Sequence, residues 1–240
     1  MKIRNSLILA SLASLAVLSA PAQAEYTQTE IEKIIHDYII NNPDVLIEAS
    51  AKVMARQKEI EDMEKQQHIA SISANKMFPQ SGPAKADHVI IEFFDYNCGY
   101  CKKAKPLLID LLKEHKDTRY IYMELPILSK ISYTAAKIGI AIYNIDRNKY
   151  VEYNNKMMTR SSRLNDESEI KSVVESIGLD WEKVNEVAKK PEVDEVISAV
   201  RKEAEALKVN GTPAFIVDGE ALYGAPMSKE QVLTLFKKKK

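Results

Sequence analysis

The chain has 240 residues, with 34 basic and 34 acidic side chains, so its formal net charge at pH 7 is zero. This balance argues against a dedicated nucleic-acid binder, and no nucleic acid is expected among the partners. The length fits one large domain, or one domain with an appendage.

The first 24 residues have the pattern of a secretory signal peptide. Lys2 and Arg4 precede an apolar run over residues 7–18 that is too short to span a bilayer. Ala22 and Ala24 then have the A-x-A spacing of a signal-peptidase site. The alternatives are an uncleaved anchor or an ordinary first helix. We predict a cleaved signal peptide over residues 1–24 and a periplasmic location.

Residues 25–80 are predicted to form a helical extension that could support oligomerisation. Thr29 is expected to cap a first helix, and Pro43 fits the first turn of a second one. The second helix carries an imperfect apolar seam: Leu46, Ala49, Val53, Ile60, Met63 and Ala70. Its other faces are charged, so it must lie on the body or pair with a copy of itself. Residues 78–83, which contain two prolines and a glycine, are predicted to be a linker.

The rest of the chain is predicted to have an α/β fold with the order β-α-β, a helical insertion, then β-β-α. Strands are expected at residues 88–94, 119–124, 214–218 and 221–223, the last two as a hairpin. Helices are expected from Cys98 to about His115, over residues 132–207, and from Ser228 to about Phe236. The predicted boundaries are a first part at 81–128, an inserted helical domain at 129–207 and a second part at 208–240.

The two cysteines of the chain are Cys98 and Cys101, separated by Gly99 and Tyr100. A bridge that closes so short a loop removes little entropy from the unfolded chain, so redox chemistry explains the pair better than stability does. The pair follows a predicted strand at the predicted start of a helix, whose unpaired N–H groups and partial positive charge stabilise a thiolate. Cys98 is therefore expected to be exposed, to have a depressed pKa and to attack, with Cys101 as the shielded resolving partner.

Alternative interpretations of this pair are half a metal site or a passive bridge. A structural zinc site needs four ligands, and the four histidines are scattered without paired spacing. No metal and no cofactor is therefore expected.

Glu92 is the one acidic residue in an otherwise apolar predicted strand. Burial would raise its pKa, and its place six residues before Cys98 would let it exchange the proton of Cys101. The alternative is a solvent-facing position on an edge strand. Thr212-Pro213 precedes another apolar strand, and X-Pro is where cis peptide bonds occur.

The segment from Glu92 to Cys101, together with Gly211-Thr212-Pro213-Ala214, resembles the DsbA-like branch of the thioredoxin superfamily. The resemblance covers residues 86–236 and implies a thioredoxin-like fold with an inserted helical domain. It also implies that Thr212-Pro213 is cis and packs against the disulfide, and that Glu92 matches the buried acid of this branch. The dipeptide between the cysteines and the Thr212-Pro213 pair are accordingly expected to contact substrate.

Two features depart from the DsbA oxidase. That enzyme typically has a Pro-His dipeptide, whereas Gly99-Tyr100 looks like the dipeptide of the DsbC isomerase, and Thr212 is also similar to DsbC. The uncharged dipeptide predicts a less depressed Cys98 pKa than a His-containing one, hence a weaker oxidant. The helical extension is unlike the β-rich DsbC dimerisation domain and looks more like the leader of ScsC-like and other oligomeric DsbA-like proteins.

Three functions therefore compete. The first is an oligomeric isomerase or reductase that acts on disulfides of exported proteins and is kept reduced by a membrane redox partner, with residues 26–78 joining the copies. The second is a monomeric DsbA-like dithiol oxidase that introduces disulfides. The third is a non-enzymatic copper binder, because two thiolates suit Cu(I), although no Met–His cluster supports it. The pattern favours the first.

Overall fold

The computed structural model describes residues 26–237, so the expected signal peptide and its cleavage site lie outside the described residues. The chain divides into two compact units between Gln57 and Lys58, and each is described by itself. Within residues 26–237, no helix combines the length and the apolar character that crossing a bilayer requires.

The first unit contains α1 (Gln28–Asn41) and the beginning of α2 (Asp44–Ala74). The expected cap at Thr29 is wrong, because Thr27 is the N-cap. The Thr27 backbone N–H donates a 2.9 Å hydrogen bond to the Glu30 carboxylate, and the Glu30 N–H donates to the Thr27 hydroxyl. This reciprocal pair needs a Glu three residues after the cap, a spacing that Thr27 has with Glu30 and that Thr29 also has with Glu32. Pro43 directly precedes α2 rather than standing in its first turn.

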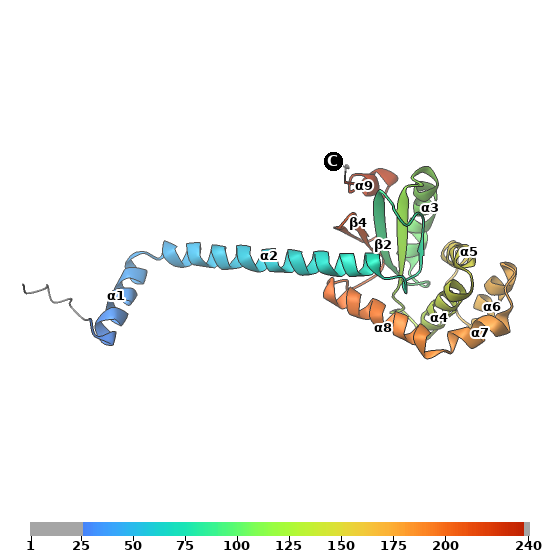
Figure 1. Ribbon diagram of the computed structural model, residues 1–240, viewed down its shortest axis with the longest axis horizontal. Coiled ribbons are helices and arrows are strands. Elements are labelled where there is room, and N and C mark those ends of the chain that lie inside the picture. The colour runs from blue at the N-terminus through green and yellow to red at the C-terminus, as the bar shows by residue number, and fades with distance from the viewer. Residues whose placement is uncertain (1–25, 238–240) are drawn as a thin grey trace, which may run out of the picture. The chain divides into compact units, whose positions relative to one another are not determined.

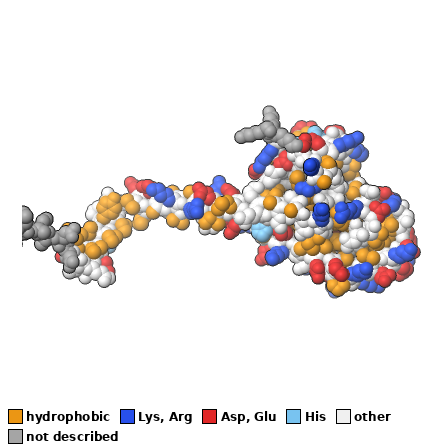
Figure 2. Space-filling view, viewed as in Figure 1, with side chains coloured by type: hydrophobic (Ala, Val, Ile, Leu, Met, Phe, Trp, Pro, Cys, Tyr) orange, Lys and Arg blue, Asp and Glu red, His pale blue; other side chains and the backbone are white. Residues whose placement is uncertain are grey.

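Apolar side chains are exposed along both helices of this unit (Figure 2). On α1 they are Ile31, Ile34, Ile35 and Tyr38, and on the beginning of α2 they include Leu46 and Val53. Among residues 26–57 no side chain is buried. Residues 26–57 therefore form no hydrophobic core among themselves, as the charged faces of the predicted helix suggested.

The second unit is built on a five-stranded sheet of order β1-β3-β2-β4-β5. Its strands are β1 (Gln80–Ser81), β2 (His88–Phe94), β3 (Thr118–Glu124), β4 (Ala214–Val217) and β5 (Glu220–Tyr223). β2 and β3 run parallel, and the other neighbours are antiparallel. The predicted strands and their order are confirmed, with β1 added at one edge.

The prediction of a linker at residues 78–83 is wrong. β1 pairs with β3 inside this segment, and Phe78 just before it is buried. Gly82 follows with φ of +88°, and a Cβ there would come within 2.2 Å of the Thr118 carbonyl oxygen. Proline and glycine mark a tight turn onto a sheet edge as readily as they mark a linker, and composition does not separate the two.

The last turns of α2 belong to this second unit. Ile72 is fully buried, and His68 Nδ1 lies 2.8 Å from the Glu203 carboxylate. The contacts therefore divide the chain at residue 57, whereas composition placed the end of the extension at residue 80.

Seven further helices complete the described part of the second unit. They are α3 (Gly99–Glu114), α4 (Lys130–Ile145), α5 (Arg147–Met158), α6 (Glu167–Ser176), α7 (Trp181–Ala188), α8 (Pro191–Ala206) and α9 (Lys229–Leu233). Ser228 caps α9 as predicted, but the helix ends at Leu233 rather than near Phe236. α4 to α8 form the predicted helical insertion and gather beside one end of the sheet (Figure 1).

The sheet separates two hydrophobic cores. Successive side chains of β2 point to opposite faces of the sheet, and this decides which core each of them enters. Ile90 and Phe94 enter the core that contains α3, α5, α6 and α7, while Ile91 and Phe93 enter the core that contains α8. Glu92 has the same parity as Ile90 and Phe94 and therefore faces the side of α3. The predicted α/β class with a helical insertion is confirmed.

Candidate active site around Cys98 and Cys101

Cys98 stands at the junction between β2 and α3, where it is the N-cap of the helix. Its sulfur accepts a hydrogen bond from the Cys101 backbone N–H at 3.4 Å, and both cysteines are free thiols. Cys101 lies one turn later and is completely buried. Cys98 keeps only 6% of its surface exposed, so the expectation of an openly exposed sulfur is corrected. The loop before β4 covers it, since the Thr212 carbonyl lies 3.1 Å from the sulfur.

The surroundings of the two sulfurs separate their pKa values. A hydrogen bond from the Cys101 side chain, helped by Thr212 and by the backbone N–H groups of Tyr100 and Cys101, lowers the pKa of Cys98 to about 5. Burial of the sulfur acts in the opposite direction, but the hydrogen bonds outweigh it. Burial, followed by the bond to Cys98 and the charge of Glu92, raises the pKa of Cys101 above its ordinary range. One sulfur is thus prepared to attack while the other stays protonated.

The Thr212–Pro213 peptide bond is cis, as the family resemblance implies. Beside it lies a cavity of about 530 Å³, lined by Lys208, residues 210–213, Tyr223 and Gly224. β5, which supplies Tyr223, is the edge strand of the sheet, so its outer backbone groups are open to another strand. This arrangement can receive an extended peptide next to the Cys98 sulfur.

Glu92 is 1% exposed on β2, between β3 and β4, so the alternative of a solvent-facing edge position is wrong. The Tyr120 hydroxyl donates a 2.6 Å hydrogen bond to Glu92 Oε2, whereas the buried Oε1 has no hydrogen-bond partner among residues 26–237. Burial raises the pKa of Glu92, while the nearby charge of Lys105 and the bond from Tyr120 lower it. The carboxyl group can therefore change protonation state close to the two cysteines.

Lys105 is a site residue that the sequence analysis missed. It is 2% exposed on α3, and its ammonium group donates a short hydrogen bond to the Asn154 carboxamide of α5. Burial lowers the pKa of Lys105 to about 8, and the carboxylates of Glu92 and Glu124 act in the opposite direction. A signal was available in the sequence, because Lys105 lies four residues after Cys101 and three before Leu108, at the spacing of one helix face.

Glu124, at the end of β3, is a second buried carboxyl group that the sequence analysis did not select. Tyr96 and Tyr150 donate hydrogen bonds of 2.8 and 3.0 Å to its Oε1. Burial raises its pKa well above the ordinary value. Gly139 of α4 leaves room for it, since a Cβ there would come within 2.8 Å of the same oxygen.

The loop before Cys98 is held by two buried polar side chains. The Asp95 carboxylate accepts bonds from the backbone N–H groups of Asn97 at 2.7 Å and of Ile127 and Leu128 at 2.9 Å. Asn97 Oδ1 accepts from the Leu164 N–H at 2.7 Å, which ties the loop to the helical insertion. Asp95 and Asn97 lie within the resembling motif, but only the fold identifies what they hold.

The structure thus brings together Cys98, Cys101 and Thr212, and leaves Gly99 and Tyr100 exposed at the start of α3. Glu92 lies within electrostatic range of both cysteines. Within residues 26–237, no group of three or more His, Cys, Asp or Glu side chains is placed to hold a metal ion.

Solved structures resemble this chain over most of its length. A thioredoxin-like oxidoreductase from Silicibacter pomeroyi DSS-3 is 30% identical, with 69% of this chain and 93% of that chain covered and a TM-score of 0.64. The thiol-disulfide exchange protein alpha-DsbA2 from Wolbachia pipientis is 25% identical, with coverage of 75% and 96% and a TM-score of 0.68. A Proteus mirabilis ScsC variant shares the fold at 21% identity, with coverage of 90% and 97% and a TM-score of 0.66.

The chain spans only about a fifth of the length of a curated relative that it matches. Na(+)/H(+) antiporter NhaA 3 from Salinispora tropica is 24% identical over 144 residues, which are 60% of this chain and 22% of the antiporter.

Two family models match two different parts of the chain. Residues 28–59 match the copper resistance protein ScsC N-terminal domain, which covers α1 and the beginning of α2. Residues 89–231, more than half of the chain, match the DSBA-like thioredoxin domain and cover the sheet and the helical insertion. The predicted thioredoxin-like fold is thereby confirmed, and the chain belongs to the DSBA-like thioredoxin domain family.

Proposed function

We propose that this protein is a periplasmic thiol:disulfide oxidoreductase that acts on the disulfides of exported proteins through Cys98 and Cys101. The observation that carries the proposal is the Cys98 sulfur at the N-terminus of α3, with a pKa lowered to about 5 by its hydrogen bonds. At pH 7 such a thiol is almost entirely thiolate, which is the nucleophilic form. Membership of the DSBA-like family supports the same chemistry.

The reaction would proceed by two exchanges. The Cys98 thiolate attacks one sulfur of a substrate disulfide, forms a mixed disulfide and releases the other substrate sulfur as a thiolate. Cys101 then loses its proton and attacks the Cys98 sulfur, which forms the Cys98–Cys101 disulfide and releases the second substrate thiolate. The substrate gains two electrons and the protein loses two. In isomerisation, a second substrate thiolate attacks the mixed disulfide instead and restores the Cys98 thiolate.

Glu92 is proposed to accept the Cys101 proton during the second exchange. The high pKa of Cys101 makes this proton hard to lose to a buried site without a base. Glu92 shares an electrostatic coupling with Cys101, and its Oε1 has no hydrogen-bond partner among the described residues. A carboxylate held by Tyr120 and Lys105 is available as that base.

The substrate is proposed to lie between the cis-proline loop and the edge of β5. Gly99 and Tyr100 directly follow Cys98 in the chain, and the Thr212 carbonyl, just before Pro213, lies 3.1 Å from the Cys98 sulfur. The cavity next to the loop and the open edge of β5 would hold an extended segment that carries the disulfide. Backbone pairing of this kind fits many exported sequences, because it does not depend on particular side chains.

The direction of exchange is proposed to favour isomerisation or reduction. A Cys98 pKa of about 5 lies between the values of about 7 for thioredoxin and about 3.5 for the oxidase DsbA. A more stable thiolate makes the disulfide a stronger oxidant, so this site would oxidise less strongly than DsbA. A membrane redox partner would then keep the pair reduced. The competing function is a monomeric dithiol oxidase, in which the partner would reoxidise the pair.

Association of several copies through the extension is the second part of the proposal. The apolar side chains of α1 and the beginning of α2 are exposed, and leaving them in water costs about 25 cal/mol per Å². The match of residues 28–59 to the ScsC N-terminal domain covers the same segment. Several active sites in one assembly would let a second Cys98 thiolate attack another disulfide of the same substrate.

The deciding experiment compares the full mature protein with a variant that lacks residues 26–57. This deletion ends before Ile72, Phe78 and β1, which belong to the body. We expect light scattering to show an oligomer that becomes a monomer, and refolding of scrambled ribonuclease to fall while insulin reduction persists. A Cys98→Ser variant gives the background.

Full isomerase activity in a monomeric deletion variant would remove the oligomeric interpretation and leave the chemistry of the Cys98 pair intact. Strong oxidation of reduced ribonuclease without isomerisation would instead establish the monomeric oxidase. Equal activity in the Cys98→Ser variant would overturn the assignment of the site.

A further inference from the structure

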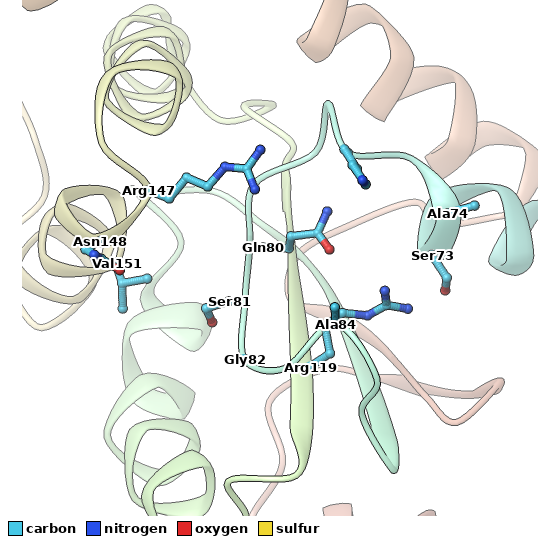
Figure 3. A pocket seen from close by; sticks show the side chains of 11 residues that line it. Ser73, Ala74, Gln80, Ser81, Gly82, Ala84, Arg119, Arg147, Asn148 and Val151 are labelled. Carbon is cyan, nitrogen blue, oxygen red and sulfur yellow. The ribbon is translucent and has the colours of Figure 1, made fainter.

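A second cavity, remote from the cysteines in the fold, lies at the opposite edge of the sheet. Its volume is about 520 Å³, within the range of small-molecule sites. The end of α2, β1 with the turn after it, β3 and the first turn of α5 form its walls. Figure 3 shows Arg147 extending from α5 toward Gln80, while Arg119 extends from β3 toward Ser73.

The charged side chains that line this cavity are all positive. Lys76, Arg119 and Arg147 line it, and no Asp or Glu does. Asp146, next to Arg147 in the chain, is engaged as the N-cap of α5, where its carboxylate accepts from the N–H groups of Asn148 and Lys149. Over residues 26–237, no ion pair neutralises any of the three cations. Three close cations without counter-charges attract an anion.

Arg119 supplies an independent sign of a missing partner. Its Nε atom is buried and has no hydrogen-bond partner among the residues the structure describes. A buried donor without an acceptor costs free energy, and such donors are rare in native proteins. An anion in the cavity would supply the acceptor.

Beside Arg119, the wall of the cavity is formed by a close backbone contact between Gly82 and β3. Gly82, which lines the cavity, has φ of +88°, and a Cβ there would come within 2.2 Å of the Thr118 carbonyl oxygen. The chain therefore passes against β3 at the residue preceding Arg119, in a conformation that favours glycine. This close approach holds the turn after β1 in place and keeps one side of the cavity fixed.

We propose that this cavity binds a phosphate group through the guanidinium groups of Arg119 and Arg147, with Lys76 adding charge. Guanidinium groups bind phosphate with two parallel hydrogen bonds, a geometry that an ammonium group cannot reproduce. The cavity is much larger than phosphate alone, so it would also hold the molecule that carries the group. That molecule is a soluble phosphate monoester or the headgroup of an anionic phospholipid.

The test follows arginine Nε–H signals of the nitrogen-15-labelled protein by NMR during titration with glycerol 3-phosphate. We expect the Arg119 signal to shift and saturate, and binding to weaken at least about tenfold in Arg119→Gln and in Arg147→Gln. Arg201→Gln is the matched control, because Arg201 stacks over the Tyr133 ring outside the cavity, and it should bind like the parent protein.

Sedimentation with phosphatidylglycerol vesicles distinguishes the two sources of phosphate. Vesicle binding that needs Arg119 and Arg147, without saturable binding of glycerol 3-phosphate, would support the site and assign it to a lipid headgroup. Saturable binding of the monoester with no vesicle binding would support it and assign it to a soluble ligand. Shifts that potassium chloride reproduces at equal ionic strength, or equal binding in all variants, would overturn the proposal.

Discussion

The Tyr120 hydroxyl donates a 2.6 Å hydrogen bond to Glu92 Oε2, while Oε1 of the same carboxyl group is buried without a hydrogen-bond partner in the described chain. The bond favours the carboxylate, and burial favours the neutral acid. Opposing influences of this kind hold a carboxyl group where it can both accept and return a proton.

Glu92→Gln should slow the second exchange. Glutamine keeps the shape of the side chain but cannot accept the Cys101 proton, so resolution of the mixed disulfide should slow on the order of a hundredfold at neutral pH. Quenched-flow trapping of the mixed disulfide measures this step. Glu124→Gln is the matched control, because Tyr96 and Tyr150 already hold that carboxyl group. Similar rates in both variants would assign Glu92 to a structural role.

Lys105→Met should raise the pKa of Glu92. The positive charge of Lys105 lowers that pKa at present, so its removal leaves burial with less opposition. Carbon-13 NMR of the Glu92 carboxyl group across a pH titration measures the change. Lys103→Met serves as control, since Lys103 is exposed on the same helix and its ammonium group lies 5.2 Å from the centre of the Tyr100 ring. An unmoved Glu92 titration in Lys105→Met would refute the coupling.

The contribution of Cys98 to the stability of the reduced protein should grow as the pH rises from about 5 to about 9. The folded state lowers the pKa of Cys98 from 9.0 to about 5, so its contribution is complete above the unfolded value and is lost as the pH falls through the folded one. Above about pH 9 Cys101 should act in the opposite direction, because its raised pKa makes it ionise more readily in the unfolded chain. Urea unfolding of the reduced protein and of Cys98→Ser, combined with thiolate absorbance, measures both effects. A flat difference between the two proteins would contradict the lowered Cys98 pKa.

The two cysteine variants should behave differently. Cys98→Ala should abolish insulin reduction, because the attacking thiolate is gone. Cys101→Ala should accumulate mixed disulfides with substrates, because the resolving sulfur is gone. Non-reducing electrophoresis after alkylation detects these adducts. Adducts from Cys98→Ala instead of Cys101→Ala would reverse the order of attack.

Gly82→Ala should destabilise the fold by about 2–4 kcal/mol, since it adds a backbone clash to an unfavourable φ. Gly178→Ala separates the two causes. Gly178 also has a positive φ, of +81°, but a Cβ there meets nothing within 4 Å, so only about 1 kcal/mol is expected. Urea unfolding gives both free energies of unfolding. Equal losses would show that the contact with Thr118 is relieved by movement of the turn.

Local signals in the sequence placed most of the elements. The bounds of β2 agree with the predicted strand, and α3 begins one residue after Cys98, because alternation and helix periodicity depend on neighbouring residues. The errors arose where two local signals compete. Thr27 and Thr29 both precede the first apolar turn, and each has a glutamate three residues later, Glu30 and Glu32, so the spacing alone does not choose between them. Residues 78–83 have the composition of a linker, yet they form a sheet edge because β3 offers an unpaired side.

The sequence by itself determined that Cys98 stands at a helix N-terminus with Cys101 one turn behind it, since both facts follow from local spacing. Only the tertiary structure decided the chemistry of their surroundings. Thr212 is 114 residues from Cys98 in the chain. Lys105 of α3 interacts electrostatically with Glu92 of β2 and with Glu124 of β3. A pKa depends on burial and on charges within a few ångströms, and contacts between distant segments set both. The same reason hid the cationic cavity, whose Lys76, Arg119 and Arg147 come together only when the sheet forms.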